Sequence, residues 1–212
     1  MQAETQSEPL RERRRRELRQ HLSDVATRMF LERGFDAVRV ADVARACGVT
    51  EKTVFNHFRT KESLLVDRWD EQTRALCRGL ADPAISPVDA ALAVLEEELA
   101  FLTSPSSQRA GAFGLDELRR FSELVGSTPS LVSHNRQALD RLTAAAAATL
   151  ADRTRNGPQD PEPWITATAL AGLWRVYTIS LHRHLAATDA ARIARAVSRD
   201  LQRAADTLRR GI

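Results

Sequence analysis

The sequence predicts an all-α fold, and three observations support that prediction. Aromatic residues make up only 5% of the 212 residues, so a core must come mostly from Ala, Leu, Val and Ile, and Ala and Leu favour helices. Apolar residues recur at three- and four-residue spacing along most of the chain, as on one face of a helix. No alternating run is long enough to predict a strand, and clusters of Pro, Gly and Ser separate the helical segments.

The N-terminal part predicts one long helix and two short ones behind a disordered tail over residues 1–9. Gly34 is a natural C-cap for the long helix, and Gly48 ends the first short helix. Thr50 is a suitable N-cap for the second short helix. The three helices are expected at 10–33, 40–47 and 51–58.

The remaining chain predicts further helices, which brings the total to about nine. A fourth helix is expected from Lys61 to Leu80, with Thr60 as its N-cap. The rest are expected at about 87–103, 108–125, 129–154, 161–186 and 189–210. The sequence therefore divides into a helix-turn-helix domain over 10–60 and a larger helical domain over 61–212.

Positive charge is concentrated near the N-terminus. The chain has a net charge of +3, but the stretch from Pro9 to Lys61 holds 13 Arg and Lys against 7 Asp and Glu, and the rest holds 18 against 21. A basic segment on a mildly acidic body indicates a polyanionic partner. The run from Arg11 to Arg19 is either a solvated helix end or a contact to phosphates or the minor groove.

The segment from Val40 to Phe58 has the spacing of a helix-turn-helix. With Val40 as the first position, Ala44 stands where two helices cross closely, and a larger side chain would push them apart. Gly48 lets the chain turn with positive φ. Val54 then buries the inner face of the second helix against the first.

The outer face of that second helix would carry short polar side chains and a cation, suited to base edges and phosphates in the major groove. These residues are Thr50, Glu51, Lys52, Thr53, Asn56 and His57.

From about Leu18 to Leu65 the sequence resembles the TetR family of transcriptional regulators. The likeness is carried by the segments Met29–Phe35, Val40–Ala44, Cys47–Thr50, Thr53–Phe58 and Lys61–Leu65. The resemblance implies a three-helix DNA-binding domain, a larger helical ligand-binding domain, and a homodimer formed by the last two long helices, at about 161–210.

The resemblance also implies which side chains face double-stranded DNA. Carried over by position, they are Thr50, Lys52, Thr53, Phe55, Asn56 and His57, with Lys61 on a phosphate at the start of the fourth helix. Two positions depart from the family pattern. Arg39 stands where the family has a capping Thr or Ser, so it can reach a phosphate by charge but cannot cap. Phe55 stands where the family has Tyr and lacks the hydroxyl, so it either faces DNA or packs.

Large side chains of the second domain form a candidate ligand pocket, namely Phe101, Phe121, Trp174 and Tyr177. Trp174 and Tyr177 share one helix face. If that face points inward it lines a pocket or packs in the core, and if it points outward it belongs to the dimer seam. Arg175 is then either a pocket cation or part of an interface ion pair.

These features favour a cytoplasmic, ligand-responsive repressor that a small-molecule effector releases from a near-palindromic operator. The alternative is a constitutive DNA-binding dimer or an activator without an effector. An enzyme is not expected, since no phosphate loop or nucleophile motif is found. No cofactor or metal site is expected, and Cys47 is interpreted as a packing residue. No signal peptide or membrane-spanning run is found, so no membrane partner is expected.

Overall fold

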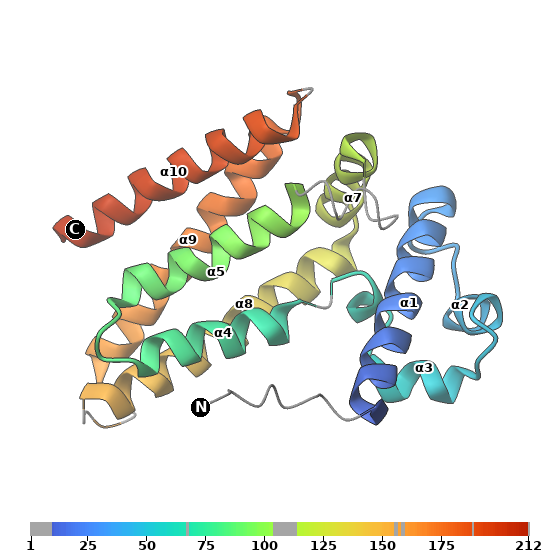
Figure 1. Ribbon diagram of the computed structural model, residues 1–212, viewed down its shortest axis with the longest axis horizontal. Coiled ribbons are helices and arrows are strands. Elements are labelled where there is room, and N and C mark those ends of the chain that lie inside the picture. Colours follow the sequence, from blue (N-terminus) through green and yellow to red (C-terminus); the bar gives the residue numbers. More distant parts are fainter. Residues whose placement is uncertain are drawn as a thin grey trace, which may run out of the picture. The chain divides into compact units, whose positions relative to one another are not determined.

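The computed structural model describes residues 10–66, 68–103, 114–154, 157, 160–187 and 189–211. Every regular element within those ranges is a helix (Figure 1), which confirms the all-α prediction. The chain forms two compact units that divide after residue 67. The sequence placed this division a few residues earlier, between 60 and 61.

The N-terminal unit is built on one long helix. Its elements are α1 (Leu10–Arg33), α2 (Val40–Ala46), α3 (Glu51–His57) and the 3-10 turn η1 (Glu62–Leu64). Gly34 ends α1 with a φ of +84°, the left-handed conformation that glycine adopts without steric cost. The core is an apolar cluster from all four elements, made of Leu22, Ala26, Phe30, Val43, Val54, Phe58 and Leu64.

The predicted fourth helix from Lys61 to Leu80 is wrong in its first two turns. Thr60 and Ser63 bond reciprocally, each accepting the other's backbone N–H at 3.2 Å, but they cap only η1. The buried Ser23 hydroxyl donates to the Leu64 carbonyl at 2.9 Å, the group that a continuous α-helix would offer to the amide four residues later. The α-helix of this segment starts at Trp69.

The C-terminal unit is a bundle of six helices among the described residues. Their bounds are α4 (Trp69–Ala81), α5 (Pro87–Thr103), α7 (Leu115–Ser127), α8 (Pro129–Thr154), α9 (Pro161–His184) and α10 (Ala190–Arg210). The bounds of α5 and α8 are those predicted. The segment predicted at 108–125 begins outside the described residues, and α7 ends two residues later than expected.

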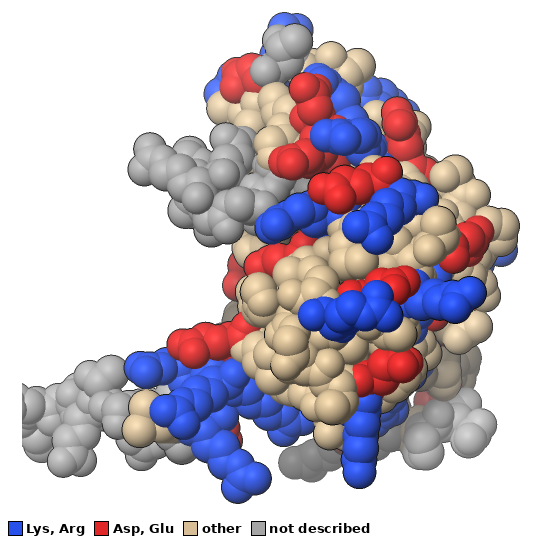
Figure 2. All heavy atoms as spheres, turned by 90° about the vertical axis from the view of Figure 1, so that its right-hand side faces the viewer, with Lys and Arg blue, Asp and Glu red and all other residues tan. Residues whose placement is uncertain are grey.

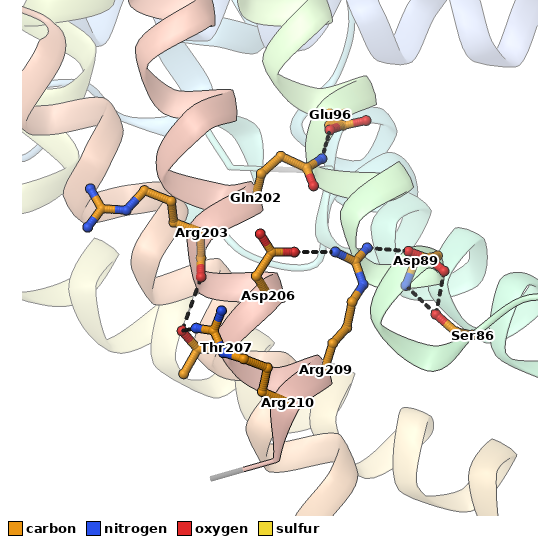
Figure 3. Close-up of polar contacts among 9 residues, drawn as sticks. All are labelled: Ser86, Asp89, Glu96, Gln202, Arg203, Asp206, Thr207, Arg209 and Arg210. Carbon is orange, nitrogen blue, oxygen red and sulfur yellow. Dashed lines mark hydrogen bonds and ion pairs between the residues drawn. The ribbon is translucent and has the colours of Figure 1, made fainter.

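Helix α9 packs against α5, α8 and α10, and α4 packs against α5 and α8 (Figure 1). Polar contacts fix the ends of this bundle. The Arg153 guanidinium donates to the carbonyls of Leu80 at 3.1 Å and Ile85 at 3.0 Å, at the end of α4. Figure 3 shows Arg209 between Asp206 on its own helix, at 2.8 Å, and Asp89 on α5, at 2.5 Å. Among the described helices, none is both long and apolar enough to cross a bilayer.

Candidate nucleic-acid interface

Helices α2 and α3 cross closely, as the spacing predicted. Val43, Ala44 and Val54 are all buried between them and α1. Gly48 turns the chain with a φ of +66°, and the amide of Val49 then donates to the Ala44 carbonyl at 2.9 Å. The turn at Gly48 and the packing of Val54 against α1 and α2 together set the orientation of α3.

Thr50 caps α3, as predicted. Its hydroxyl accepts from the backbone N–H of Thr53 at 3.1 Å and lies 2.9 Å from the Thr53 hydroxyl. This satisfies one of the free amides of the first turn. The two hydroxyls therefore sit side by side at the start of α3, with Thr50 exposed and Thr53 half-buried.

The face of α3 opposite Val54 is open to solvent. Lys52 and Asn56 are both exposed and lie about 160° around the helix from Val54 on either side, at 100° per residue. Phe55, next to them, is 49% exposed, so its ring does not belong to the core. The face thus offers a cation, an amide and an apolar ring on one short helix.

Arg39 precedes α2 and, as expected, makes no side-chain cap there. The start of α2 keeps a reciprocal contact, because the Asp42 carboxylate accepts from the Arg39 backbone N–H at 3.0 Å and from Arg45 at 3.1 Å. The backbone bond and these charges lower the pKa of Asp42. The exposed guanidinium of Arg39 is therefore not needed to start the helix.

Arg19 of α1 contacts the C-terminal end of α3, and this contact was not predicted. Its guanidinium donates to the His57 carbonyl and lies 4.2 Å from the centre of the Phe58 ring. Partial burial, and then the charges of Arg15 and Arg19, lower the pKa of His57. The only available signal was the position of Arg19 one turn before the buried Leu22.

Lys61 is half-buried and lies beside the rings of Phe30 and Phe35. Its ammonium is 4.3 Å from the centre of the Phe35 ring and 5.7 Å from that of Phe30. It precedes η1 and not a continuous fourth helix. Its contact with a phosphate stays a prediction. The contact would be made from the residue before a 3-10 turn, and not from the start of a long helix as the sequence predicted.

The four predicted pocket residues lie in different surroundings. Trp174 and Tyr177 are buried in the core of the C-terminal unit, so this face of α9 points inward, whereas Arg175 is exposed. The Tyr177 hydroxyl is buried without a hydrogen-bond partner. Phe101 is 39% exposed, with the Arg68 guanidinium 4.0 Å from its ring centre. Phe121 is half-buried on α7.

A buried carboxylate near these aromatics was missed. Glu98 forms an ion pair of 2.6 Å with Arg68, and burial raises its pKa against the opposing effect of Arg68. Gln72 hydrogen-bonds to Glu98 and accepts from the Trp174 indole at 2.9 Å. The sequence signal for its burial was the position of Glu98 on the apolar face of α5, four residues after Val94.

A groove on the described surface lies between α9 and α10. It has a volume of about 540 Å³, and its walls include Ile179, Arg183, Asp200 and Arg203. In Figure 3 the Arg203 side chain points away from α5. None of the four predicted pocket residues lines this groove. No group of three or more candidate metal ligands occurs in the described part of the chain.

Comparisons with known proteins agree with this geometry. Residues 22–67 match the family model described as bacterial regulatory proteins, tetR family. The chain is 37% identical over 54 residues to the HTH-type transcriptional regulator AcrR of Shigella flexneri, covering 26% of this chain and 25% of the relative. It is 33% identical over 75 residues to the HTH-type transcriptional repressor DhaR of Mycobacterium sp. (strain GP1), covering 34% and 38%.

The chain thus spans well under half the length of these two relatives. A solved structure described as a SmeT–triclosan complex shares the fold, with a TM-score of 0.52 and 19% identity over 88% of this chain and 91% of that one. The matched segment contains α2, α3 and the turn at Gly48. Over this helix-turn-helix segment, residues 22–67, the chain is similar to the tetR family of bacterial regulatory proteins.

Proposed function

We propose that this protein is a transcriptional regulator that binds duplex DNA through the exposed face of α3. The observation that carries the proposal is the geometry of that face. Val54 is buried and Thr50 caps the helix, so Lys52 and Asn56 project outward on a short, fixed element. Amide and ammonium groups on an exposed helix suit the edges of adenine and guanine in the major groove.

We propose further that it acts as a homodimer through α9 and α10. Helix α9 leaves two large aliphatic side chains in solvent, Ile165 at 70% and Ile179 at 54% exposure, and a homodimer would bury them. Two copies related by a two-fold axis would place two α3 helices in successive major grooves. The half-sites of a near-palindromic operator would then lie about 34–36 Å apart.

The third part of the proposal is a small-molecule effector that releases the protein from DNA, making it a repressor. The candidate site is formed by Phe101, Phe121, Trp174 and Tyr177. Two observations support it: the Tyr177 hydroxyl has an unused hydrogen bond, and a protein of the same fold was solved with triclosan. Such a ligand acts only through different affinities for two conformers.

The test starts with selection of duplexes from a random library by the purified full chain. The proposal predicts enrichment of an inverted repeat and a dimer by light scattering. No enrichment, together with a monomer, would contradict it.

The effector is tested separately, by a thermal-shift screen on the dimer followed by titration of each hit against the protein–DNA complex. A hit that lowers affinity for the selected duplex supports a ligand-responsive repressor. If no compound in a broad screen changes that affinity, the constitutive DNA-binding dimer or activator is favoured instead.

A further inference from the structure

The first turns of α1 carry a dense positive charge that the helix-turn-helix does not use. Residues 10–19 read LRERRRRELR, with six Arg and two Glu. All residues from 10 to 17 are exposed. Figure 2 shows blue side chains gathered at its lower left, where α1 begins. A solvent-exposed helix end with this charge can contact a polyanion.

The structure connects one side of this helix end to the DNA-facing helix. Arg19 donates to the carbonyl of His57, so this part of α1 lies at the C-terminal end of α3. Arg15, one turn earlier, is close enough for its charge to act on His57. The side of α1 that carries these two residues therefore borders a residue expected to face DNA.

Helix geometry separates the arginines into two groups. At about 100° per residue, Arg11 and Arg15 lie within about 80° of Arg19 around the helix axis, whereas Arg13 and Arg14 lie at least about 120° away. Arg13 also pairs with Glu17 at 3.5 Å, which offsets part of its charge. Arg16 lies within about 60° of Arg19 but on its other side, about 100° or more from Arg11 and Arg15. The cations on the side of Arg15, whose charge acts on His57, are therefore Arg11, Arg15 and Arg19.

The length of the segment sets its reach. From Arg19 back to Leu10 the helix extends about 13 Å at 1.5 Å per residue, comparable to four base pairs of B-DNA at 3.4 Å each. This cationic side would lie beyond the base pairs that α3 covers.

We propose that Arg11 and Arg15 form a second DNA contact, to backbone phosphates flanking the base pairs read by α3. This inference rests on the proposed DNA binding and extends the interface beyond the helix-turn-helix. A helix with its side chains is about 10–12 Å across and does not fit a minor groove about 6 Å wide. The contact therefore adds affinity without adding sequence preference.

An anionic membrane is the less favoured partner for this surface. Helices that lie on a membrane combine a basic face with an apolar one. Within residues 10–19 the only apolar side chains are Leu10 and Leu18, and they do not make such a face. The charge pattern fits a polyanion that is contacted through its phosphates alone.

The test compares two double variants with the same change of charge. Arg11→Gln/Arg15→Gln removes the side bordering α3, and Arg13→Gln/Arg14→Gln removes the far side of the same turns. Gln keeps the helix propensity close to that of Arg, and circular dichroism checks that both variants fold. Affinity for the selected duplex is measured by fluorescence anisotropy between 50 and 200 mM salt.

The first variant should reduce the slope of log K against log salt by about 3.6 for the dimer, since each of its two chains loses two phosphate contacts and each contact contributes about 0.9. The second variant should leave the slope near that of the wild type. Trimming the flanks of the duplex should reduce the wild-type slope and abolish the difference between wild type and the first variant. The base sequence enriched from a random library should be the same for all three proteins.

Equal slopes for wild type and both variants would overturn the inference, and so would equal losses in both variants. Loss of binding to phosphatidylserine vesicles with an unchanged DNA slope would assign the surface to a membrane and overturn it as well. If the wild-type chain selects no duplex at all, the proposed function itself fails. The two failures are therefore distinguishable.

Discussion

Replacing Arg19 by Met should loosen the C-terminal end of α3 and weaken DNA binding without unfolding the protein. Met keeps most of the apolar stem of Arg but has neither its charge nor its donors. The change removes the hydrogen bond to the His57 carbonyl and the stacking of the guanidinium 4.2 Å above the Phe58 ring. Helix α3 has only seven residues, so contacts at its end matter more than they would on a long helix.

The size of the effect follows from those two contacts. A hydrogen bond from a charged donor contributes about 1.5–3 kcal/mol, and a cation–π contact at a partly exposed site contributes about 0.5–1 kcal/mol. Partial solvation of Arg19 places the sum near the lower end, at about 2 kcal/mol. Because about 1.4 kcal/mol corresponds to a factor of ten, local opening of α3 should become about 30-fold more frequent.

Hydrogen exchange read by mass spectrometry on peptides covering residues 51–58 measures this opening directly. The matched control is Arg28→Met, at an exposed position of the same helix, which should leave exchange in α3 unchanged. Wild-type exchange rates for α3 in the Arg19 variant would refute the reasoning. An equal acceleration in both variants would refute it too, since the effect would then belong to α1 as a whole.

Three further perturbations test other parts of the structure. Gly48→Ala should destabilise the N-terminal unit by about 1–2 kcal/mol. The cost is backbone strain at a φ of +66°, because no atom lies within 4 Å of the added Cβ. An unchanged free energy of unfolding in urea would contradict the left-handed conformation of Gly48. His57 has a lowered pKa in the free protein, and DNA phosphates favour its charged form. Affinity should therefore rise as pH falls below about 6.5, by at most tenfold per pH unit for each of the two His57 side chains of the dimer. His57→Gln should flatten that profile, and an unchanged profile would remove the residue from the interface. Tyr177→Phe should leave the melting temperature unchanged or raise it by about 1–3 °C, because it removes a buried hydroxyl that has no hydrogen-bond partner. A melting temperature lower by several degrees would mean that the hydroxyl is hydrogen-bonded.

Local patterns predicted most of the helices and the turn. The apolar stripe with Gly34 behind it predicted α1 from Leu10 to Arg33, and the cap at Thr50 is in place. These features were accessible because they depend on neighbours within one or two turns. The orientation of Lys52 and Asn56 could be expected for the same reason, once Val54 was assigned to the core.

The parts that could not be predicted depend on contacts across long stretches of sequence. The predicted fourth helix is interrupted near Leu64, where Ser23, 41 residues earlier, donates to the Leu64 carbonyl. Arg19 reaches the end of α3 across 38 residues, and the buried Glu98 pairs with Arg68, the residue before α4. In each case a polar group found a partner that helical periodicity does not reveal.

The central claim is that the exposed face of α3 reads duplex DNA, and Asn56 tests it most directly. Asparagine bonds adenine through two atoms in the major groove, and such a pair gives about 1–3 kcal/mol of discrimination. Library selection and anisotropy with Asn56→Ala should show an affinity that is lower by about 5- to 150-fold for each half-site of the wild-type duplex, and a relaxed preference at one position of each half-site. An unchanged affinity and an unchanged selected sequence would contradict the claim.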